Sequence, residues 1–377
     1  MKSVVVILYL LFTQSSFCQV TFAINKLPDN HDYKKDIFIS GNFEGWSGGQ
    51  NSYKLTQNNN SYFITLPKEN KTINFKFTLG SWAFVECTSN GNSIENRTYT
   101  FNKIQDTVDV TIDNWSDGKP KEIASTATKN VHVFAEDFKM PQLNRTRKIS
   151  VYLPPDYETT TTRFPVLYIQ DGQNMFDAAT SFSGEWEVDE TLNKLSKTKG
   201  IDIIVVAINH GDDKRINEYS PWDNSKYGKG EGNAYLEFLV HTLKPEIDKK
   251  YRTKTDAKNT AIMGSSMGGL ISHYAGLKYP QVFGKVGVFS PSFWYSDESF
   301  SVTKNHAALK HTKMYYLAGG KEDETMVNNL EKILNIMKKN KFSQRNLYSK
   351  IVPDGTHSES FWKTEFGNAI EWLFLKN

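Results

Sequence analysis

The sequence predicts an α/β domain with a mostly parallel sheet, preceded by an all-β, immunoglobulin-like sandwich domain. Before about Trp115, short alternating runs are broken by Gly, Asn, Asp and Ser, which is typical of antiparallel sandwiches. After about Val131, apolar strand-like runs alternate with amphipathic helical stretches, as expected when helices cover both faces of a sheet. A chain of 377 residues is also longer than a single core usually grows.

The first residues have the pattern of a secretory signal peptide. Lys2 precedes an apolar run from Val4 to Phe12, which is the order of charge and hydrophobicity in such signals. The run is too short to span a bilayer. Cleavage after Cys18 would remove residues 1–18, and a lipid anchor on Cys18 is the alternative. We expect an exported protein, secreted or periplasmic, with no membrane span.

Residues 19–115 form the predicted sandwich. Its candidate strands alternate apolar and polar residues in the runs IFIS, SYFITLP, INFKFTLGSW and TVDVTIDNW. The polar stretch 116–130, with Gly118 and Pro120, is the predicted linker. After removal of residues 1–18 only Cys87 remains as a cysteine, so no disulfide within the chain is expected.

Residues 131–377 form the predicted α/β domain. Its candidate strands are the runs KISVYLPP, FPVLYIQDG, IDIIVVAIN, NTAIMGSS, KVGVFS, KMYYLAGG and LYSKIVPDG. Helical stretches such as NAYLEFLVHTLKPEIDKKY and MVNNLEKILNIMKKN lie between them. Continuous apolar runs of this length favour strands that are buried on both faces.

Charge and metal-ligand spacing exclude two classes of function. Lys and Arg total 45 against 42 Asp and Glu, a formal charge of +3, with no basic cluster in the sequence. Nothing therefore indicates a nucleic-acid partner. The histidines and cysteines show no H-x-x-x-H or C-x-x-C spacing, so we expect neither a metal nor another cofactor in the reaction.

The segment AIMGSSMGGL, residues 261–270, contains the G-x-S-x-G pattern of a nucleophilic serine. Only Ser266 has glycine two residues away on both sides, at Gly264 and Gly268, and Ser265 is expected to face the core. An apolar strand precedes the pattern and a helical stretch follows it, which is the context of a nucleophile elbow. The alternative is a tight glycine turn without catalysis.

The base and the acid should follow this serine in the order acid, then histidine. His357 fits best, because it follows the last predicted strand on a loop, in the run DGTHS. His273 lies inside the helix after the serine, where a packing role is favoured. The strand KMYYLAGG is followed by three consecutive acids, Glu322, Asp323 and Glu324, and composition does not choose among them.

Several stretches together resemble the "Putative esterase" family of α/β-hydrolases: RTRKISVYLPPDY, FPVLYIQDGQNMFD, GSSMGGLISHYAGLKYP, FSPSFWY, and GGKEDE followed by DGTHS. The resemblance covers about residues 131–377. This family includes feruloyl and acetylxylan esterases, S-formylglutathione hydrolases and enterochelin-type siderophore esterases. The resemblance implies an α/β-hydrolase fold and metal-free serine ester hydrolysis.

The resemblance also narrows the site. The family's pattern of strand, G-x-x and acid ends here on Glu322, which favours Glu322 over Asp323 although many relatives carry Asp. An acyl-transfer site needs donors for the oxyanion, one being the backbone N–H after the nucleophile, which belongs to Met267. The family's second donor falls on Gln173, next to Gly172. Asp171 stands where several relatives have histidine.

Three tryptophans follow predicted strands of the α/β domain: Trp186, Trp222 and Trp294. Ligands of such folds bind at the carboxyl ends of the strands, so we expect these rings to contact substrate, with ordinary packing as the alternative. Arg215 is the one obvious cation for an anionic substrate, and a structural ion pair with Glu218 is its alternative role.

The front domain, with IFISGNFEGWSGG and INFKFTLGSWAFVE, resembles the starch- and glycogen-binding sandwiches, families 20 and 48 of carbohydrate-binding modules. This implies that Trp46 and Trp82 stack on sugar rings, and a rigid spacer is the alternative. The expected function is therefore an exported serine esterase whose substrate is an ester-bearing polysaccharide or oligosaccharide, with feruloyl or acetyl groups first. A siderophore esterase and an inactive carbohydrate-binding protein are the competing hypotheses.

Overall fold

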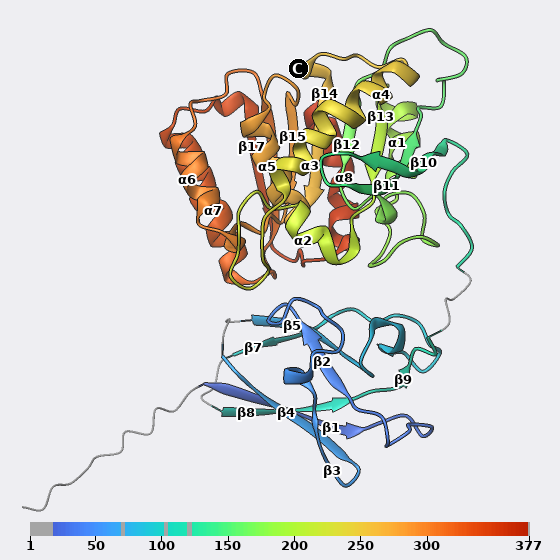
Figure 1. The fold of residues 1–377 in the computed structure, drawn as a ribbon, viewed down its shortest axis with the longest axis vertical. Coiled ribbons are helices and arrows are strands. Elements are labelled where there is room, and N and C mark those ends of the chain that lie inside the picture. The colour runs from blue at the N-terminus through green and yellow to red at the C-terminus, as the bar shows by residue number, and fades with distance from the viewer. Residues whose placement is uncertain (1–17, 69–71, 102–104, 119–122, 376–377) are drawn as a thin grey trace, which may run out of the picture. The chain divides into compact units, whose positions relative to one another are not determined.

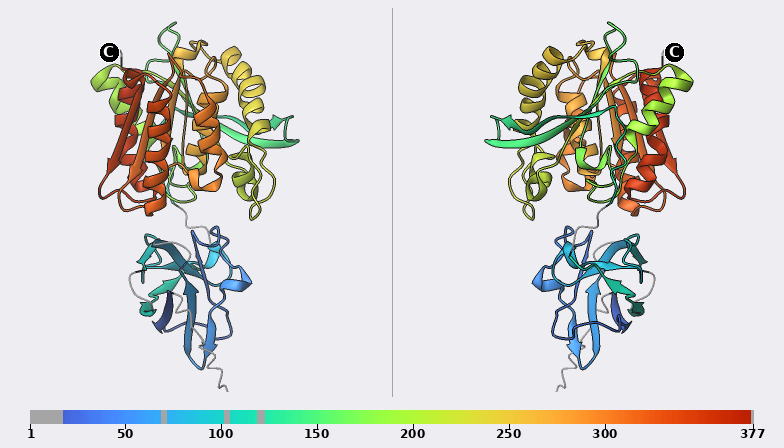
Figure 2. Two further views of the ribbon diagram at one scale, coloured as in Figure 1. Left: turned by 90° about the vertical axis from the view of Figure 1, so that its left-hand side faces the viewer. Right: turned by 90° about the vertical axis from the view of Figure 1, so that its right-hand side faces the viewer.

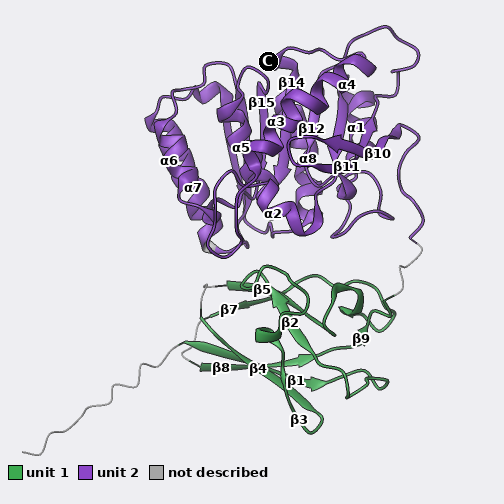
Figure 3. Ribbon diagram, viewed as in Figure 1, with its two compact units in different colours: residues 1–121 green, residues 122–377 purple. Residues whose placement is uncertain are grey.

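The computed structural model describes residues 18–68, 72–101, 105–118 and 123–375. Residues 1–17 of the expected signal peptide and residues 119–122 of the expected linker lie outside this range. The chain divides into two compact units, Met1–Lys121 and Glu122–Asn377 (Figure 3). Each unit is described by itself.

Unit 1 is all-β, as the sequence predicts. Its described elements are β1 (Gln19–Lys26), β2 (Phe38–Gly41), η1 (Asn51–Tyr53), β3 (Thr56–Asn58), β4 (Ser61–Pro67), β5 (Thr72–Thr78), η2 (Trp82–Phe84), β6 (Glu86–Cys87), β7 (Arg97–Thr100), β8 (Gln105–Thr111) and β9 (Asn114–Trp115). The described strands form the sheets β3-β4-β1-β8, β2-β5-β7 and β6-β9. Their pairing is antiparallel except between β1 and β8. The alternating side chains Phe22, Phe75 and Phe77 meet in one apolar core, because every second residue of a strand faces the same side.

Unit 2 alternates strands and helices, as the sequence predicts. Its described elements are β10 (Val131–Met140), β11 (Arg145–Tyr152), β12 (Val166–Ile169), η3 (Gly172–Asn174), α1 (Val188–Lys199), β13 (Ile204–Ile208), η4 (Asp212–Lys214), α2 (Arg215–Glu218), α3 (Gly232–Phe238), η5 (Leu239–Leu243), α4 (Lys244–Lys250), η6 (Ala257–Asn259), β14 (Thr260–Ser265), α5 (Met267–Lys278), β15 (Lys285–Phe289), η7 (Phe293–Tyr295), α6 (Glu298–Asn305), β16 (Lys313–Gly319), α7 (Glu324–Lys339), η8 (Gln344–Asn346), β17 (Leu347–Val352) and α8 (Glu359–Phe374).

The described strands of unit 2 form one sheet in the order β10-β11-β13-β12-β14-β15-β16-β17. Strands β12 to β17 run parallel, whereas β10 and β11 add an antiparallel edge. Helices α1 and α8 pack on one face of the sheet, and α3, α4, α5 and α7 pack on the other (Figures 1 and 2). This explains the uninterrupted burial of the β13 run Ile204–Ile208 and the β14 run Thr260–Ser265, and it confirms the predicted fold class.

The strand order brings distant segments to one edge of the sheet. From β12 the chain passes to β13 on one side and later to β14 on the other, which makes a switch point between β12 and β14. Ligands of open α/β sheets bind outside the carboxyl ends of the strands at such a point. The described helices include none that is long and apolar enough to cross a membrane.

Candidate active site

Ser266 occupies a strained turn between strand and helix. β14 ends at Ser265 and α5 begins at Met267, and Ser266 between them has φ 57° and ψ −123°. This backbone conformation is unfavourable for a residue with a side chain and is characteristic of functional turns. A Cβ on Gly264 would lie 2.7 Å from the carbonyl carbon of Gly268, so the first glycine of the pattern permits the close approach that the turn requires.

The two adjacent serines have different surroundings. Ser265 is the buried last residue of β14, paired with Phe289 of β15. Ser266 is only partly buried, and its backbone N–H donates to the carbonyl of Phe289 at 2.9 Å. The Ser266 hydroxyl lies 3.2 Å from the Ser292 hydroxyl. The geometry therefore presents Ser266, not Ser265, at the edge of the sheet.

Glu322 supplies a buried carboxylate after β16. Its side chain is 1% exposed, and Oε1 accepts hydrogen bonds from the Ser290 hydroxyl at 2.5 Å and the Gly319 N–H at 3.1 Å. Asp323, the competing acid, is the N-cap of α7 and accepts from the Met326 N–H at 2.9 Å. Because one carboxylate turns inward and the next caps a helix, the structure supports the choice of Glu322.

His357 lies on the loop between β17 and α8, with Nδ1 3.5 Å from Glu322 Oε2. The imidazole packs edge-on against Trp362, with ring centres 4.9 Å apart. Burial lowers the pKa of His357, but the hydrogen bond and charge of Glu322 outweigh it, so the pKa is raised. Since β14, β16 and β17 are parallel, their carboxyl ends bring Ser266, Glu322 and His357 to the same edge.

Within the described residues, the hydrogen-bond partner of the Ser266 hydroxyl is Ser292 rather than His357. Catalytic hydrogen bonds in unliganded sites are often long and tighten only in the substrate complex. The arrangement of serine, histidine and buried carboxylate is the set of groups that acyl transfer to serine requires.

The two predicted oxyanion donors follow neighbouring strands of the sheet, β14 and β12. Met267 is the first residue of α5, where backbone N–H groups have no acceptor within the helix. Gln173 lies in η3 after β12, and its side-chain oxygen accepts from the His210 N–H at 3.1 Å. A Cβ on Gly268 would lie 3.3 Å from Asp171 Oδ2, so the turns after β12 and β14 are in contact.

Sequence reasoning missed four residues that surround this site. Ser290 has φ 42° and is fully buried; its hydroxyl donates to Glu322 and accepts from the Trp362 indole N–H at 2.9 Å. Trp362 therefore contacts His357 directly and Glu322 through Ser290. The other two are Ser292 and Glu359. The run FSPSFWY carried a signal for Ser290 and Ser292 because it follows a strand next to β14.

Glu359 is the first residue of α8, two positions after His357. Its carboxylate accepts from the Asn174 amide at 3.3 Å. Burial raises the pKa of Glu359 to about 7. A carboxyl group that titrates near neutral pH beside a catalytic histidine is a candidate for tuning that histidine.

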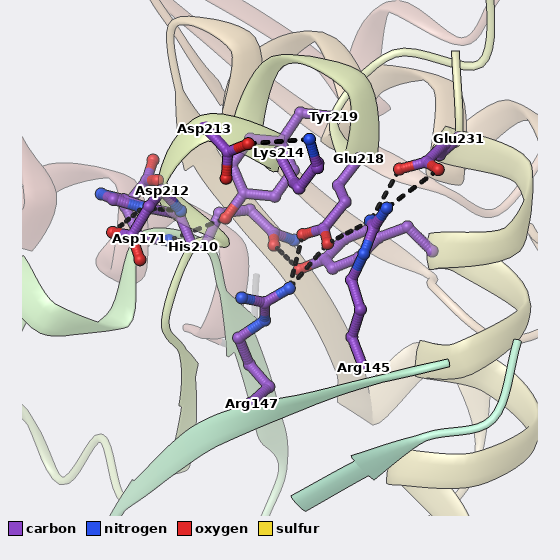
Figure 4. A network of polar contacts seen from close by, with 12 residues as sticks. Arg145, Arg147, Asp171, His210, Asp212, Asp213, Lys214, Glu218, Tyr219 and Glu231 are labelled. Atoms are coloured by element: carbon purple, nitrogen blue, oxygen red, sulfur yellow. Dashed lines mark hydrogen bonds and ion pairs between the residues drawn. The ribbon is translucent and has the colours of Figure 1, made fainter. Parts of the chain in front are cut away.

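Arg215 and Glu218 do not pair with each other. Arg215 forms two hydrogen bonds with Asp171, at 2.7 and 2.9 Å, so Asp171 neutralises the one cation predicted for an anionic substrate. Burial would raise the pKa of Asp171, but the Arg215 guanidinium outweighs it and the pKa is lowered. The fully buried Glu218 instead binds Arg145 and Arg147 (Figure 4).

The predicted tryptophans of unit 2 divide into three cases. Trp186 is 1% exposed and packs on Phe289 and Trp362, so the expectation that it contacts substrate is corrected: it belongs to the core because α8 covers it. Trp222 is partly buried against Tyr274. Trp294 is 47% exposed. Phe182, which the sequence analysis did not select, is 67% exposed on the loop after β12.

In unit 1, Trp46 and Trp82 lie side by side. Their ring centres are 5.9 Å apart and the Trp82 indole N–H donates to the Trp46 carbonyl at 2.9 Å. Both rings are partly exposed. Trp46 has φ 59°, so the turn that precedes Gly48 is held in a conformation that presents this pair together.

Comparison with known proteins gives the following similarities. The family model described as "Putative esterase" matches residues 140–373. The uncharacterized protein YbbA of Bacillus subtilis is 27% identical over 246 residues, 61% of this chain and 94% of its own length. The endo-1,4-beta-xylanase/feruloyl esterase of Xylanibacter ruminicola is 28% identical over 183 residues, 48% of this chain and 23% of its own.

Among solved structures, the enterobactin esterase FES from Shigella flexneri aligns with a TM-score of 0.56 at 16% identity. The alignment covers 94% of this chain and 92% of that one. At this identity the likeness concerns the fold.

Proposed function

We propose that this chain is an exported serine esterase that acts on feruloyl or acetyl esters of a plant polysaccharide. The chain belongs to the "Putative esterase" family and is a carboxylic ester hydrolase. Ser266 is the nucleophile, His357 the general base and Glu322 the acid that orients it. No sequence feature calls for a cofactor. The sandwich unit serves to hold the carbohydrate.

The mechanism uses these groups in two halves. The Ser266 hydroxyl attacks the ester carbonyl carbon while His357 takes its proton, and Glu322 at Nδ1 stabilises the resulting imidazolium. The N–H groups of Met267 and Gln173 bind the oxyanion. Collapse of the tetrahedral intermediate breaks the bond to the alcohol, which leaves with the proton from His357. Water, deprotonated by His357, then attacks the acyl carbon, and the bond to Ser266 breaks as His357 returns the proton to the serine oxygen, which releases the free acid.

One observation carries the choice of substrate class: both carboxylate oxygens of Asp171 accept from Arg215, at Nε and Nη2, so this cation is already paired. The carboxylates of Glu322, Asp323 and Glu359 all act to raise the pKa of His357. A site with this charge favours a neutral ester over an anionic iron complex, because like charges repel at close range. The exposed rings of Phe182 and Trp294 offer apolar surface for an aryl acid or a sugar.

The first experiment tests the nucleophile. Hydrolysis of p-nitrophenyl acetate should fall by roughly 10⁴- to 10⁶-fold in Ser266→Ala, the range seen when a triad member is removed. Ser265→Ala is the matched control and should keep most of the activity. A fluorophosphonate probe should label Ser266 in the wild type. Equal losses in the two variants, or no labelling, would favour the inactive binding protein.

The second experiment tests the substrate. Release of ferulate from feruloylated arabinoxylan and acetate from acetylated xylan is compared with cleavage of ferric enterobactin, using the full chain. We expect the polysaccharides to be preferred, and Trp46→Ala with Trp82→Ala to weaken activity on them but not on p-nitrophenyl acetate. The siderophore hypothesis is supported by the fold likeness to FES along 94% of this chain, and much faster cleavage of enterobactin would replace the polysaccharide proposal.

A further inference from the structure

Three acidic side chains meet beside the chain segment that enters unit 2. Oxygens of Glu185, Asp189 and Glu190 all lie within 4.8 Å of one another. Glu185 precedes α1, and the other two lie in its first turn. They belong to neither the candidate catalytic triad nor its oxyanion donors.

The cluster holds buried carboxylate oxygens without donors. Asp189 is 0% exposed, and its Oδ1 has no hydrogen-bond partner among the described residues, nor has the buried Oε2 of Glu190. No described lysine, arginine or histidine forms an ion pair with any of the three acids. Buried carboxylates without donor or counter-charge are costly, and proteins normally satisfy them by pairing or by metal coordination.

The remaining oxygens of the cluster contact the segment that opens unit 2. The Thr126 hydroxyl lies 2.9 Å from both oxygens of Glu185, and the Thr128 N–H donates to Asp189 Oδ2 at 2.8 Å. These contacts tie residues 123–130 to the start of α1 and leave Asp189 Oδ1 without a hydrogen-bond donor among the described residues.

We propose that Glu185, Asp189 and Glu190 bind one calcium-type divalent cation, which fastens the segment 123–130 to the esterase unit. Oxygen-only ligands select hard cations, and Ca²⁺ tolerates the irregular geometry of three carboxylates with added water better than Mg²⁺, which requires a near-ideal octahedron. The cation bridges the donor-free oxygens of Asp189 and Glu190 to Glu185, and Thr126 and Thr128 hold those carboxylates from the outside.

A proton is the competing occupant of this cluster. Burial, followed by the neighbouring Asp189 carboxylate, raises the pKa of Glu190 to about 8. A shared proton satisfies two carboxylates but leaves Glu185 without a partner in the cluster. A shared proton therefore requires only Asp189 and Glu190, whereas a bound cation requires all three side chains.

Terbium luminescence tests the site on the full chain. After treatment with a chelator, Tb³⁺ is titrated into the protein with excitation of tryptophan, because Trp186 is adjacent to Glu185 in the sequence. We expect one saturable site per chain, displaced by Ca²⁺ more readily than by Mg²⁺. Glu190→Gln and Glu185→Gln should each weaken Ca²⁺ binding more than about tenfold, because each removes a direct carboxylate ligand.

Glu187→Gln is the matched control, since Glu187 lies in the same segment but pairs with Lys363, and it should bind as the wild type does. Thermal unfolding guards against a folding defect: without calcium, Glu190→Gln should melt no lower than the wild type because an uncharged amide replaces a carboxyl group that is costly to ionise beside Asp189. Only the wild type should gain stability from Ca²⁺. No saturable site, unchanged binding in Glu190→Gln, equal loss in Glu187→Gln, or Mg²⁺ displacement as strong as that of Ca²⁺ would overturn the proposal. None of these readouts depends on esterase activity, so its failure is separate from that of the proposed function.

Discussion

Two histidines lie in contrasting regions of the same unit. His273 lies within α5, 0% exposed, with Nδ1 2.8 Å from the Tyr316 hydroxyl and Nε2 2.8 Å from the Thr303 hydroxyl. His357 lies at the edge of the sheet, 31% exposed, with the Glu322 carboxylate at Nδ1. Burial lowers the pKa of His273 to about 3, whereas the Glu322 carboxylate overcomes burial and raises the pKa of His357.

The difference shows what makes a histidine a base. Neutral partners on both nitrogens hold His273 in one uncharged state, so it can pack but cannot exchange a proton. A carboxylate on one nitrogen stabilises the imidazolium and leaves the other nitrogen for the nucleophile. Residue type is therefore less informative than the partner, and the partner is set by which strand the histidine follows.

The largest expected effect separates the two histidines by activity. His357→Gln should lower kcat for p-nitrophenyl acetate by roughly 10⁴- to 10⁶-fold, because it removes the proton acceptor of the triad. The folded fraction of His273→Gln should retain a kcat close to that of the wild type. Steady-state kinetics with circular dichroism of both variants checks this. A comparable loss of kcat in folded His273→Gln would show that activity does not distinguish His357 from His273.

The next effect concerns the partner of His357. Glu322→Gln keeps the shape of the side chain but removes the charge that stabilises the imidazolium, and kcat should fall by roughly 10²- to 10⁴-fold. Asp323→Asn alters only the cap of α7, and should cost about 1 kcal/mol of stability or less with little change in kcat. The reverse ranking of kcat would move the catalytic role to Asp323.

A third effect appears in stability. Because the unfolded state binds a proton at His273 near pH 6.5 and the folded state only near pH 3, the folded state binds fewer protons in that window and loses stability as the pH falls through it. The expected loss at pH 4 is about 3 kcal/mol relative to neutral pH. Urea unfolding at pH 7 and pH 4 should therefore show a smaller loss for His273→Gln than for the wild type. An identical loss in both proteins would mean that His273 takes up a proton in the folded state.

The fold class followed from the sequence because each signal is local. The apolar runs of β12 to β16 and the turn after Gly264 depend on neighbours in the chain. For the site, chain order selected Ser266 and His357, and the family pattern selected Glu322. These assignments stay predictions, to which the structure adds the contact of His357 with Glu322.

What could not be predicted depends on packing between distant segments. Trp186 and Trp294 both follow strands of the sheet, yet Trp186 is buried against Trp362 of α8 whereas Trp294 is 47% exposed. Asp171 and Arg215 are far apart in the chain, so the sequence around neither residue predicts their ion pair. The contact of Trp362 with both Ser290 and His357 likewise requires the final helix to be in place.

The smallest expected effect tests how finely the surroundings of His357 set its pKa. Glu359 is one of the carboxylates whose charge raises that pKa. Because its own pKa of about 7 leaves Glu359 only partly ionised where His357 titrates, Glu359→Gln should lower the pKa of His357 only slightly. The wild-type kcat/KM should rise with pH through an apparent pKa above 6.5, since the base acts in its neutral form. In Glu359→Gln this rise should move to lower pH, which makes the variant relatively more active near pH 6 with the plateau little changed. Glu187→Gln, whose carboxylate pairs with Lys363 of α8, is the control and should keep the wild-type profile. A profile that stays in place or moves to higher pH in Glu359→Gln would show that Glu359 is uncharged, or distant from the imidazole, in the working enzyme, and that Glu322 accounts for the raised pKa without it.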